Sequence, residues 1–311
     1  MAEGGESTLL DISRDPIRNV AIGIATYRRP QHLRSLLESI DAQEFDGFSV
    51  RLIVVDNDAE GSAREAAQSV RFPLKYTVEE RPGIVAARNR TLDEVIESDD
   101  ALVFVDDDEF ADPKWLSELV RYVEELKADV VSGPVVAEFL PSTPEWISTG
   151  GYWSRARVQT GAEITSVATN NTLVRTALLR SAPHVRFDDK FRETGGSDTQ
   201  FFRDLRPYAT SYRWVDSALV YEWVLEERAN ARWLFRRAVR IGNVNARYRG
   251  RISSILGGIL RVGGGAVLTL GDLIIKRRVR ARYFNMAAHG VGLIGGAVGL
   301  DIREYRRSSS S

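Results

Sequence analysis

Short apolar runs alternate with amphipathic segments through the first half of the chain, and this alternation constrains the fold more than any other feature. The apolar runs are Val20–Ala25, Arg51–Val55, Leu74–Val78, Ala101–Val105 and Asp129–Val131. Segments with helical character lie between them, at Gln31–Ala42, Ser62–Val70, Gly83–Ile96 and Pro113–Leu126. Strands that alternate with helices in this way predict an α/β protein whose sheet is largely parallel and buried.

Polar residues follow three of the predicted strands at the point where each strand ends. Thr26 follows the first strand and Asp56 follows the second, while Ala101–Val105 leads directly into Asp106. Ligands of parallel sheets bind at the carboxyl ends of the strands. We therefore expect these three positions to converge on one crevice.

Three consecutive aspartates have the spacing of a metal-binding carboxylate pair. Asp106 and Asp108 can direct their side chains toward one ligand from a turn, whereas Asp107 would point elsewhere or support them. The chain has no cysteine and only three scattered histidines, so any metal should be a hard cation held by carboxylates and phosphates. Such a cation would neutralise the charge that develops on a departing diphosphate when a sugar nucleotide is cleaved.

Asp198 is the candidate general base. A hydroxyl group is a poor nucleophile, so an inverting sugar transfer needs a carboxylate that takes the hydroxyl proton. Asp198 stands at a predicted helix start, after Gly195 and Gly196, which let a substrate approach closely. An aspartate at this position is also the common cap of a helix.

The other polar clusters have plainer interpretations as well. Asp106–Asp108 is compatible with a solvated turn, Asp56–Asp58 with a generic turn cluster, and the pair Arg28-Arg29 with solvated charge. Independent turns have no reason to fall at neighbouring strand ends of one sheet. The shared position at the strand ends therefore favours a site.

The C-terminal segment is basic and contains two apolar stretches. Between Arg228 and Arg282 there are 14 Lys or Arg residues and one acidic residue, a local charge of +13 that leaves −14 on the rest of the chain. The glycine-rich stretches Ile252–Ile275 and Tyr283–Leu300 are expected to be interfacial or core helices and not membrane spans. A basic tail on an acidic body predicts an anionic partner, either a membrane face or nucleic acid.

These patterns divide the chain into a disordered N-terminus at 1–17, a catalytic domain at 18–227 and a basic helical segment at 228–311. Met1–Ser13 is acidic and polar, so we do not expect a signal peptide, and the absence of cysteine favours the cytosol. Glu138–Thr165, rich in Pro, Trp, Ser and Gly, is expected to be a long loop.

Five short motifs occur in order along the chain, at Ala25–Pro30, Val54–Asp58, Gly83 with Arg88-Asn89, Phe104–Glu109 and Gly195–Asp198. As a set, over most of the chain, they resemble the family 2 glycosyltransferases, an inverting group with a GT-A fold. Within that group the motifs look most similar to exopolysaccharide enzymes such as the glucosyltransferase of succinoglycan assembly. The resemblance implies a mixed sheet flanked by helices, with the basic apolar helices as a C-terminal extension.

The resemblance also implies a role for each candidate residue. The residues that would bind the nucleotide sugar are Thr26, Tyr27, Arg28, Asp56, Asn57, Gly83, Arg88, Asp106 and Asp107. Of these, Thr26, Tyr27 and Arg28 would line the nucleoside pocket. Asp56 or Asn57 would face the base, and Arg88 would approach the ribose or the diphosphate. Asp106 and Asp108 would hold the diphosphate through Mg²⁺ or Mn²⁺, and Asp198 would be the general base.

Two departures refine what the resemblance implies. Ser197 stands where the family usually has a glutamate before the base, and no Gln-x-x-Arg-Trp motif of processive synthases follows Asp198. We therefore expect transfer of one sugar per encounter, from a UDP-sugar to a saccharide or lipid-linked oligosaccharide. Relatives with lipid-linked acceptors often carry basic apolar C-terminal helices, so residues 228–311 are expected to bind an anionic membrane at its cytoplasmic face. A homo-oligomer is a further possibility.

Two other functions fit part of the sequence. A phosphatase of the haloacid dehalogenase type would use Asp106 as nucleophile and Asp108 as general acid, but Phe110 stands where that family prefers Thr or Val. A nucleic-acid-binding protein would use the basic tail, yet the tail has no recognised nucleic-acid motif, so no nucleic acid is expected as partner. A Rossmann oxidoreductase is excluded because no Gly-x-Gly-x-x-Gly follows the first strand.

Overall fold

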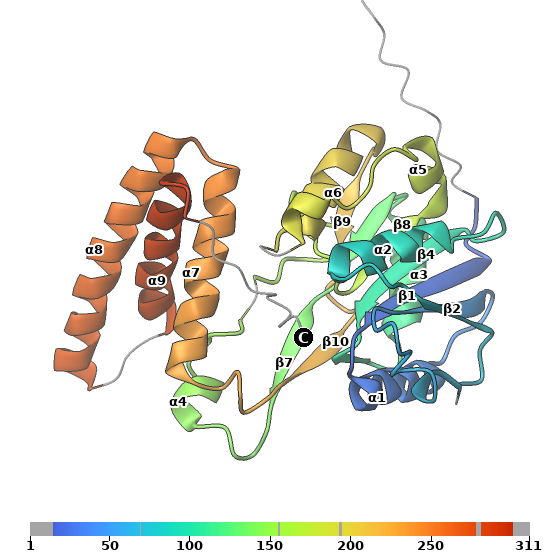
Figure 1. Ribbon diagram of the computed structural model, residues 1–311, viewed down its shortest axis with the longest axis horizontal. Coiled ribbons are helices and arrows are strands. Elements are labelled where there is room, and N and C mark those ends of the chain that lie inside the picture. Colours follow the sequence, from blue (N-terminus) through green and yellow to red (C-terminus); the bar gives the residue numbers. More distant parts are fainter. Residues whose placement is uncertain (1–14, 69, 155, 193–194, 278–280, 301–311) are drawn as a thin grey trace, which may run out of the picture. The chain divides into compact units, whose positions relative to one another are not determined.

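The computed structural model describes residues 15–300 except 69, 155, 193–194 and 278–280 (Figure 1). The chain forms two compact units. The first comprises the described residues of Met1–Val136, Arg155–Arg192 and Ser197–Glu222, and the second those of Ala137–Ser154, Glu193–Gly196 and Trp223–Ser311. The second unit therefore differs from the expected segment at 228–311, because it also takes in a segment from the middle of the chain.

A seven-stranded mixed sheet forms the first unit, in the order β3-β2-β1-β4-β8-β6-β9. Its strands are β1 (Asn19–Thr26), β2 (Ser49–Asp56), β3 (Leu74–Val78), β4 (Ala101–Asp106), β6 (Val130–Ser132), β8 (Thr172–Arg175) and β9 (Tyr212–Trp214). The four strands from β3 to β4 are parallel, β8 is antiparallel to both of its neighbours, and β9 is parallel to β6. This arrangement confirms the predicted α/β class with a parallel-rich sheet.

The register of the parallel strands brings their polar ends together. β1 pairs with β2 so that Thr26 lies opposite Asp56, and it pairs with β4 so that Ala25 lies opposite Asp106. Three neighbouring strands thus end at one edge of the sheet. The predicted convergence of these positions is confirmed at the level of the backbone.

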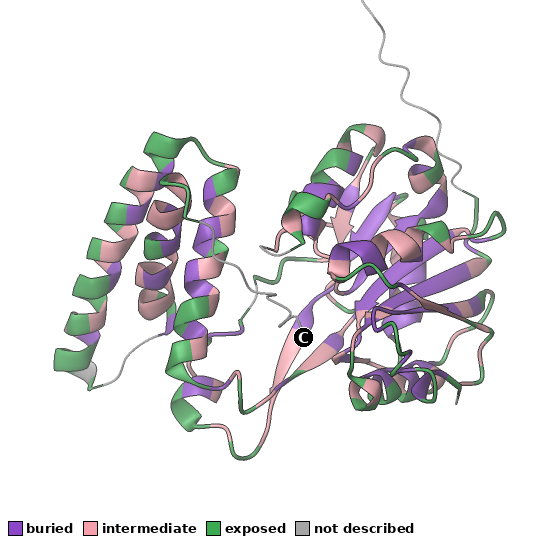
Figure 2. Ribbon diagram, viewed as in Figure 1, coloured by how far each residue is buried: buried purple, intermediate pink, exposed green. Residues whose placement is uncertain are grey.

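Helices cover both faces of this sheet (Figures 1 and 2). They are α1 (Pro30–Asp41), α2 (Ile84–Asp93), α3 (Trp115–Glu125), α5 (Thr176–Ser181) and α6 (Ser197–Leu205). Ile22 of β1 belongs to the core beneath α1 and α3, whereas its neighbour Ala21 belongs to the core beneath α2, α5 and α6. Adjacent strand residues point to opposite faces, so the apolar β1 run supplies both cores.

Several elements differ from the sequence-based expectation. The described residues of Ser62–Val70 form one short 3-10 turn, η1 (Ala66–Gln68), in place of the expected helix, and the Asp56 carboxylate accepts the N–H of Ala63 at the start of the segment. The expected loop Glu138–Thr165 contains the end of β7 (Val135–Phe139) and helix α4 (Glu145–Ser148). The remaining short elements, which the sequence did not predict, are the strands β5 (Glu109–Ala111), β8, β9 and β10 (Val220–Val224) and the 3-10 turns η2 (Asp189–Phe191) and η3 (Arg206–Tyr208).

A second sheet has three strands in the order β5-β10-β7. β10 is antiparallel to β5, with Tyr221 opposite Phe110, and the two rings stack with centroids 5.2 Å apart. Its strand β5 directly follows the three aspartates. The pairing of β5 with β10 therefore fixes the position of the chain just after Asp108.

The expected disorder at 1–17 falls mostly outside the described residues, and the structure differs from it at Ile17. The Ile17 side chain is buried, and its N–H donates to Oε1 of Glu124 at 2.7 Å. The carbonyl of Asp15 accepts from Arg175 at 2.9 Å. These contacts join residues far apart in the sequence, so local composition does not reveal them.

Three helices, α7 (Ala231–Arg247), α8 (Arg251–Lys276) and α9 (Ala281–Ala297), form most of the second unit, with α9 packed against both of the others (Figure 1). Glycines permit the close packing. A Cβ atom at Gly292 would lie 1.9 Å from the carbonyl oxygen of Val239 on α7, and one at Gly265 would lie 2.7 Å from the backbone nitrogen of Ala287 on α9. The helices approach one another through backbone at these positions.

The middle segment joins this unit through aromatic contacts. The ring of Trp153 stacks on that of Trp233, with centroids 5.5 Å apart and planes 5° apart. The guanidinium of Arg237 lies 5.7 and 5.6 Å from the two ring centroids. Ile147 and Tyr152 are buried in the same cluster. The segment expected to be loop is therefore part of a packed core.

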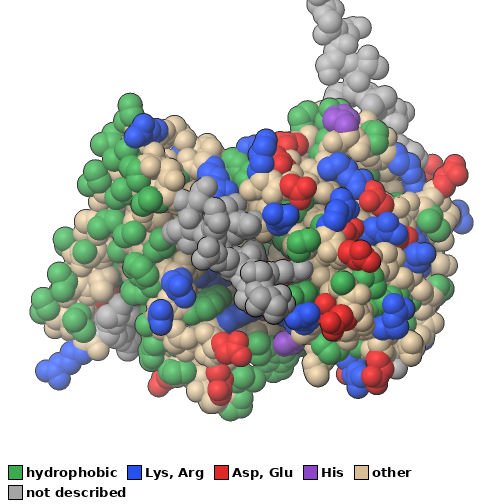
Figure 3. Space-filling view, in the orientation of Figure 1, with side chains coloured by type: hydrophobic (Ala, Val, Ile, Leu, Met, Phe, Trp, Pro, Cys, Tyr) green, Lys and Arg blue, Asp and Glu red, His purple; other side chains and the backbone are tan. Residues whose placement is uncertain are grey.

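One described helix, α8, is long and apolar enough to cross a membrane by length and composition. Within its stretch Arg251–Ile275, a window of 18 residues has a mean hydropathy of 1.6, and only 17% of that window is buried, so α8 is not a core helix. Large apolar side chains at helical spacing are exposed along one face, namely Ile252, Leu256, Ile259, Leu260, Val267, Leu270 and Ile274. Figure 3 shows hydrophobic side chains along this helix, at the left of the view.

Candidate active site

The first of the three aspartates, Asp106, ends β4 and is held from two sides. Its N–H donates to Oε2 of the buried Glu109 at 3.0 Å, which fixes the turn. Its carboxylate accepts from Nη2 of Arg88 at 3.2 Å. The Arg88 guanidinium also lies 5.9 Å from the ring centroid of Phe187, so the arginine is itself supported. The Asp106 side chain is 39% exposed and accessible to a ligand.

Two further carboxylates act on Asp106. Partial loss of water around its carboxylate raises the pKa of Asp106, the Arg88 guanidinium lowers it, and the negative charges of Asp108 and Asp198 raise it. Asp198 lies in the first turn of α6, and within the described part of the chain its carboxylate has no hydrogen-bond donor or counter-ion. The Asp106 carboxylate is thus close enough to those of Asp108 and Asp198 to be repelled by both at this edge of the sheet.

Asp107 is turned into the protein. Its carboxylate accepts from the hydroxyl of Thr26 at 2.8 Å and from Nη1 of Arg29 at 3.5 Å. The same nitrogen of Arg29 donates to Asp108 at 3.2 Å. Burial and then the charge of Asp108 raise the pKa of Asp107 to about 7. Asp107 therefore supports the turn, and the hydroxyl of Thr26 donates its hydrogen bond to Asp107.

Arg28 reaches across to the loop that follows β2. Its backbone has a positive φ of 52°, and its guanidinium donates to both carboxylate oxygens of Asp58 at 3.1 and 3.3 Å. The hydrogen bond from Arg28 lowers the pKa of Asp58. The guanidinium lies 5.3 Å from the ring centroid of Tyr27. Arg28 is 58% exposed, so it presents charge and Tyr27 presents a ring at this edge.

Asp56 and Asn57 are buried and make hydrogen bonds within the protein. The Asp56 carboxylate accepts from the hydroxyl of Tyr76 at 2.6 Å and from the N–H groups of Asp58 and Ala63 at 3.0 and 2.8 Å. In this structure Asp56 is 0% exposed. It shapes the wall of the site, and direct contact with a nucleotide base stays a prediction.

The Asn57 amide holds the loop between β3 and α2. Its nitrogen donates to the carbonyls of Glu79 and Arg81 at 2.8 and 2.7 Å, and its oxygen accepts the N–H of Gly83 at 2.7 Å. Gly83 has a positive φ of 112°, and a Cβ atom there would lie 2.6 Å from Cγ of Arg192. A glycine is required at this position because both the conformation and the space exclude a side chain.

Residues 21–181, more than half of the chain, match glycosyl transferase family 2. The succinoglycan biosynthesis protein ExoM of Rhizobium meliloti (strain 1021) is 32% identical over 302 residues, which cover 92% of this chain and 96% of that protein. The chain belongs to glycosyl transferase family 2. The protein is therefore a glycosyltransferase, and the phosphatase alternative is wrong.

Other proteins similar to this glycosyltransferase support the family assignment. The glucosyl-dolichyl phosphate glucuronosyltransferase of Haloferax volcanii is 23% identical over 235 residues, 74% of this chain and 70% of that protein. The structure of S. aureus TarS 1–349 in complex with UDP has a TM-score of 0.54 at 17% identity and covers 93% of both chains. The complex of TarS 1–349 with UDP-GlcNAc has a TM-score of 0.53 at 17% identity, covering 90% of this chain and 91% of that one. The TarS similarity confirms the expected GT-A fold.

The carboxylates at the end of β4 fit a divalent cation shared with a ligand. Among the residues that the structure describes, no three His, Cys, Asp or Glu side chains are grouped to hold a metal on their own. Asp106 and Asp108 offer hard oxygen donors, and their mutual repulsion, which raises the pKa of Asp106, would be relieved by a cation. Mg²⁺ commonly uses one or two carboxylates and completes its shell with phosphate oxygens and water.

Sequence reasoning missed several residues that shape this glycosyltransferase site. They are Arg29, Asp58, Tyr76, Asn89 and Glu109. Asn89 donates to the carbonyl of Phe187 at 2.9 Å and accepts its N–H at 3.0 Å, which secures the ring beneath Arg88. Arg29, Asp58, Asn89 and Glu109 carried a signal, because each lies within a motif beside a candidate residue. Tyr76 lies outside the motifs and carried none, because its partner Asp56 is on a neighbouring strand.

Proposed function

We propose that the protein transfers one sugar, with inversion, from a UDP-sugar to a lipid-linked saccharide in the synthesis of an exopolysaccharide or another bacterial cell-surface glycan. The observation that carries the proposal is the position of Asp106 at the end of β4, where it accepts from Arg88 and where the charges of Asp108 and Asp198 both raise its pKa. The TarS complexes with UDP and UDP-GlcNAc support the donor, and the relative in succinoglycan biosynthesis supports a role in exopolysaccharide synthesis.

Asp106 and Asp108 form the donor end of the proposed site. They would hold Mg²⁺ or Mn²⁺ together with the diphosphate, and the bound cation would stabilise the negative charge of the leaving group. Arg88, which donates to Asp106, would contact the ribose or diphosphate. Tyr27 and Arg28 would line the nucleoside pocket, where Arg28 is exposed.

Asp198 forms the acceptor end. Its carboxylate would take the proton of the acceptor hydroxyl while that oxygen attacks the anomeric carbon of the sugar. The bond between this carbon and the diphosphate breaks on the opposite side, which inverts the configuration and releases UDP. Ser197 is buried, so it would not replace the glutamate that usually precedes the base.

We also propose that the protein is a peripheral protein of the cytoplasmic membrane face. The apolar face of α8 is exposed, and the segment from Arg228 to Arg282 carries a charge of +13. An amphipathic surface with a large positive charge binds an anionic membrane in two ways: its apolar side chains enter the lipid, and its charge is attracted to the lipid headgroups. This location would bring the site to a lipid-linked acceptor.

Donor binding by Asp108→Asn tests the donor end of the site. The wild type is expected to bind UDP, or one of a panel of UDP-sugars, more tightly with Mn²⁺ than without it. The variant removes one charged oxygen donor from the cation, so it should lose this metal-dependent gain, a fall of about tenfold or more. Calorimetry with and without Mn²⁺ measures the difference.

The matched control is Asp46→Asn, which removes the same charge from an exposed loop position. The control should keep wild-type affinity. Unchanged affinity in Asp108→Asn would remove the basis for the proposed metal site.

A further inference from the structure

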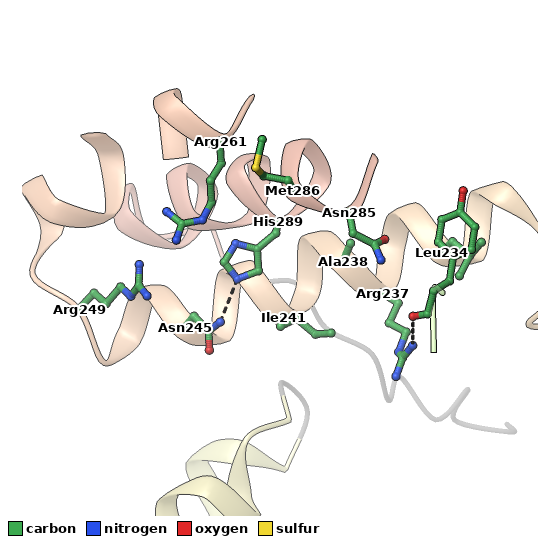
Figure 4. A pocket seen from close by; sticks show the side chains of 11 residues that line it. Leu234, Arg237, Ala238, Ile241, Asn245, Arg249, Arg261, Asn285, Met286 and His289 are labelled. Atoms are coloured by element: carbon green, nitrogen blue, oxygen red, sulfur yellow. Dashed lines mark hydrogen bonds between the residues drawn. The ribbon is translucent and has the colours of Figure 1, made fainter. Parts of the chain in front are cut away.

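The helices of the second unit border an open cavity of about 370 Å³ with a cationic lining (Figure 4). Its polar lining consists of Arg237, Asn245, Arg249, Arg261, Asn285 and His289. No carboxylate lines it. The one acidic residue in the described parts of α7, α8 and α9 is Asp272, which is not part of the lining. A cavity with three guanidinium groups and no carboxylate suits an anionic ligand.

Arg249 and Arg261 carry the charge at one end of the cavity. Among the described residues neither arginine has a carboxylate partner, and Arg261 donates to the carbonyl of Gly257 at 3.1 Å. Figure 4 shows the His289 ring between Arg261 and Asn245. Burial, and then the charges of Arg261 and Arg249, lower the pKa of His289. The positive charges of the two arginines therefore act on the inner wall, where no carboxylate neutralises them.

His289 is neutral and fixed in orientation. The amide nitrogen of Asn245 lies 2.9 Å from Nε2 of His289. An amide nitrogen can only donate, so Nε2 accepts and the neutral ring carries its proton on Nδ1. Nδ1 is buried and has no hydrogen-bond partner in the described structure. The histidine therefore adds no negative charge to the inner wall, and the guanidinium groups supply its charge.

Apolar side chains accompany the charges. Leu234, Ile241 and Met286 line the cavity together with the arginines. Along α8, Leu268 and Ile275 follow Arg261 at intervals of seven residues, so they lie on the same side of the helix. They are 43% and 79% exposed. A ligand with a phosphate and a hydrocarbon chain would satisfy both parts of this surface.

We propose that this cavity binds the phosphate headgroup of a membrane lipid, whose hydrocarbon chain lies along Leu268 and Ile275 of α8. The guanidinium groups of Arg249 and Arg261 donate to the phosphate oxygens, a geometry for which a planar guanidinium is suited. The inference rests on the proposed membrane attachment and adds a defined headgroup site to it. A general electrostatic attraction would not need a cavity.

The test compares two double variants with equal charge change. Arg249→Gln with Arg261→Gln removes the cavity charges, and Arg232→Gln with Arg236→Gln removes two exposed charges of α7 that lie outside the cavity lining. Affinity is measured by co-flotation with phosphatidylcholine vesicles that contain a fixed fraction of phosphatidic acid. Both variants lose the same long-range attraction, so the cavity variant should lose about tenfold more affinity than the control.

Equal losses in the two variants would overturn the proposal, because they would show attraction by net charge alone. Calorimetry with inorganic pyrophosphate distinguishes a free phosphate from a lipid. Binding of pyrophosphate as tight as that of the vesicles, lost in the cavity variant, would overturn the lipid as occupant. Circular dichroism melts of the variants check that both remain folded.

A separate measurement keeps this inference distinct from the proposed function. UDP binding with Mn²⁺ and without vesicles should be the same in the wild type and in both double variants. Absence of UDP binding in the wild type would contradict the proposed donor site while the vesicle comparison still decides the lipid site.

Discussion

Among the single residues of the site, Asp107 differs from its neighbours because its carboxylate faces Thr26 and Arg29. Its pKa is about 7 in the folded protein against an ordinary value of 3.8. A raised pKa means that the folded state holds the proton more tightly than the unfolded chain. The resulting stabilisation is complete below the ordinary pKa and is lost as the pH rises through about 7.

Asp107→Asn should therefore change stability in a pH-dependent way. An amide cannot ionise, so the variant avoids the buried charge that the wild type carries at alkaline pH. We expect the variant to have a higher Tm than the wild type at about pH 8, by on the order of 5 °C, and little difference at about pH 4. Thermal melts by circular dichroism without added metal measure this. A Tm difference of equal size at both pH values would contradict the buried-carboxylate interpretation.

At the residue scale, the sequence predicted which side chains lie close together when those residues stand at the ends of neighbouring strands. Thr26 and Asp106 follow from the ends of β1 and β4, whose register fixes their proximity. The choice between Arg28 and Arg29 was not predictable. Arg28 has a positive φ and its side chain contacts Asp58, whereas Arg29 contacts Asp108. The order of two adjacent arginines in a sequence does not show which of them will contact which aspartate.

At the scale of elements, length decided what could be predicted. The long periodic segment of α1 and the buried run of β4 were found almost to the residue. β8 and β9 have four and three residues, too few for a periodic pattern, and they exist because neighbouring strands supply their hydrogen bonds. The prediction of a helix at Ser62–Val70 was wrong, and the Asp56 carboxylate accepts the N–H of Ala63 at the start of this segment, a contact that helical periodicity does not reveal.

The glycines of the C-terminal helices have a measurable consequence. Gly292→Ala would place a methyl group 1.9 Å from the Val239 carbonyl, so α9 must move away from α7. We expect this variant to lose about 1–3 kcal/mol of stability, as overpacked interiors do. Thermal melts followed by circular dichroism measure the loss.

Gly295→Ala on the same helix is the matched control. Its added methyl group would meet only atoms at 3.9 Å or more, which is ordinary contact. Because alanine favours helix more than glycine does, the control should be neutral or slightly stabilising. Equal Tm values for the two variants would show that α7 and α9 do not pack through these glycines.

For the molecule as a whole, the alternation of strands and helices was enough to predict the α/β fold, and five motifs were enough to predict the family. The two-unit division was only partly visible. Ala137–Ser154 belongs with the helices because Trp153 stacks on Trp233 and Ile147 enters the same core. These contacts join distant parts of the chain, and composition alone described the segment as a loop.

The central claim is a site with two ends, a donor end at Asp106 and Asp108 and an acceptor end at Asp198. The two ends should be separable, because the metal and diphosphate contact the first and the acceptor proton moves to the second. Asp189 is an exposed aspartate in η2. Asp189→Asn is the control, because it removes one negative charge as Asp198→Asn does but leaves Asp106, Asp108 and Asp198 unchanged.

The most direct measurement is the transfer of radiolabelled sugar from a UDP-sugar to membrane lipid extract by Asp198→Asn, with UDP affinity measured on the same preparation. We predict that UDP affinity with Mn²⁺ stays at the wild-type value while transfer falls by about 10²–10⁴-fold, the usual contribution of a general base. Transfer at a near-normal rate by Asp198→Asn would contradict the account.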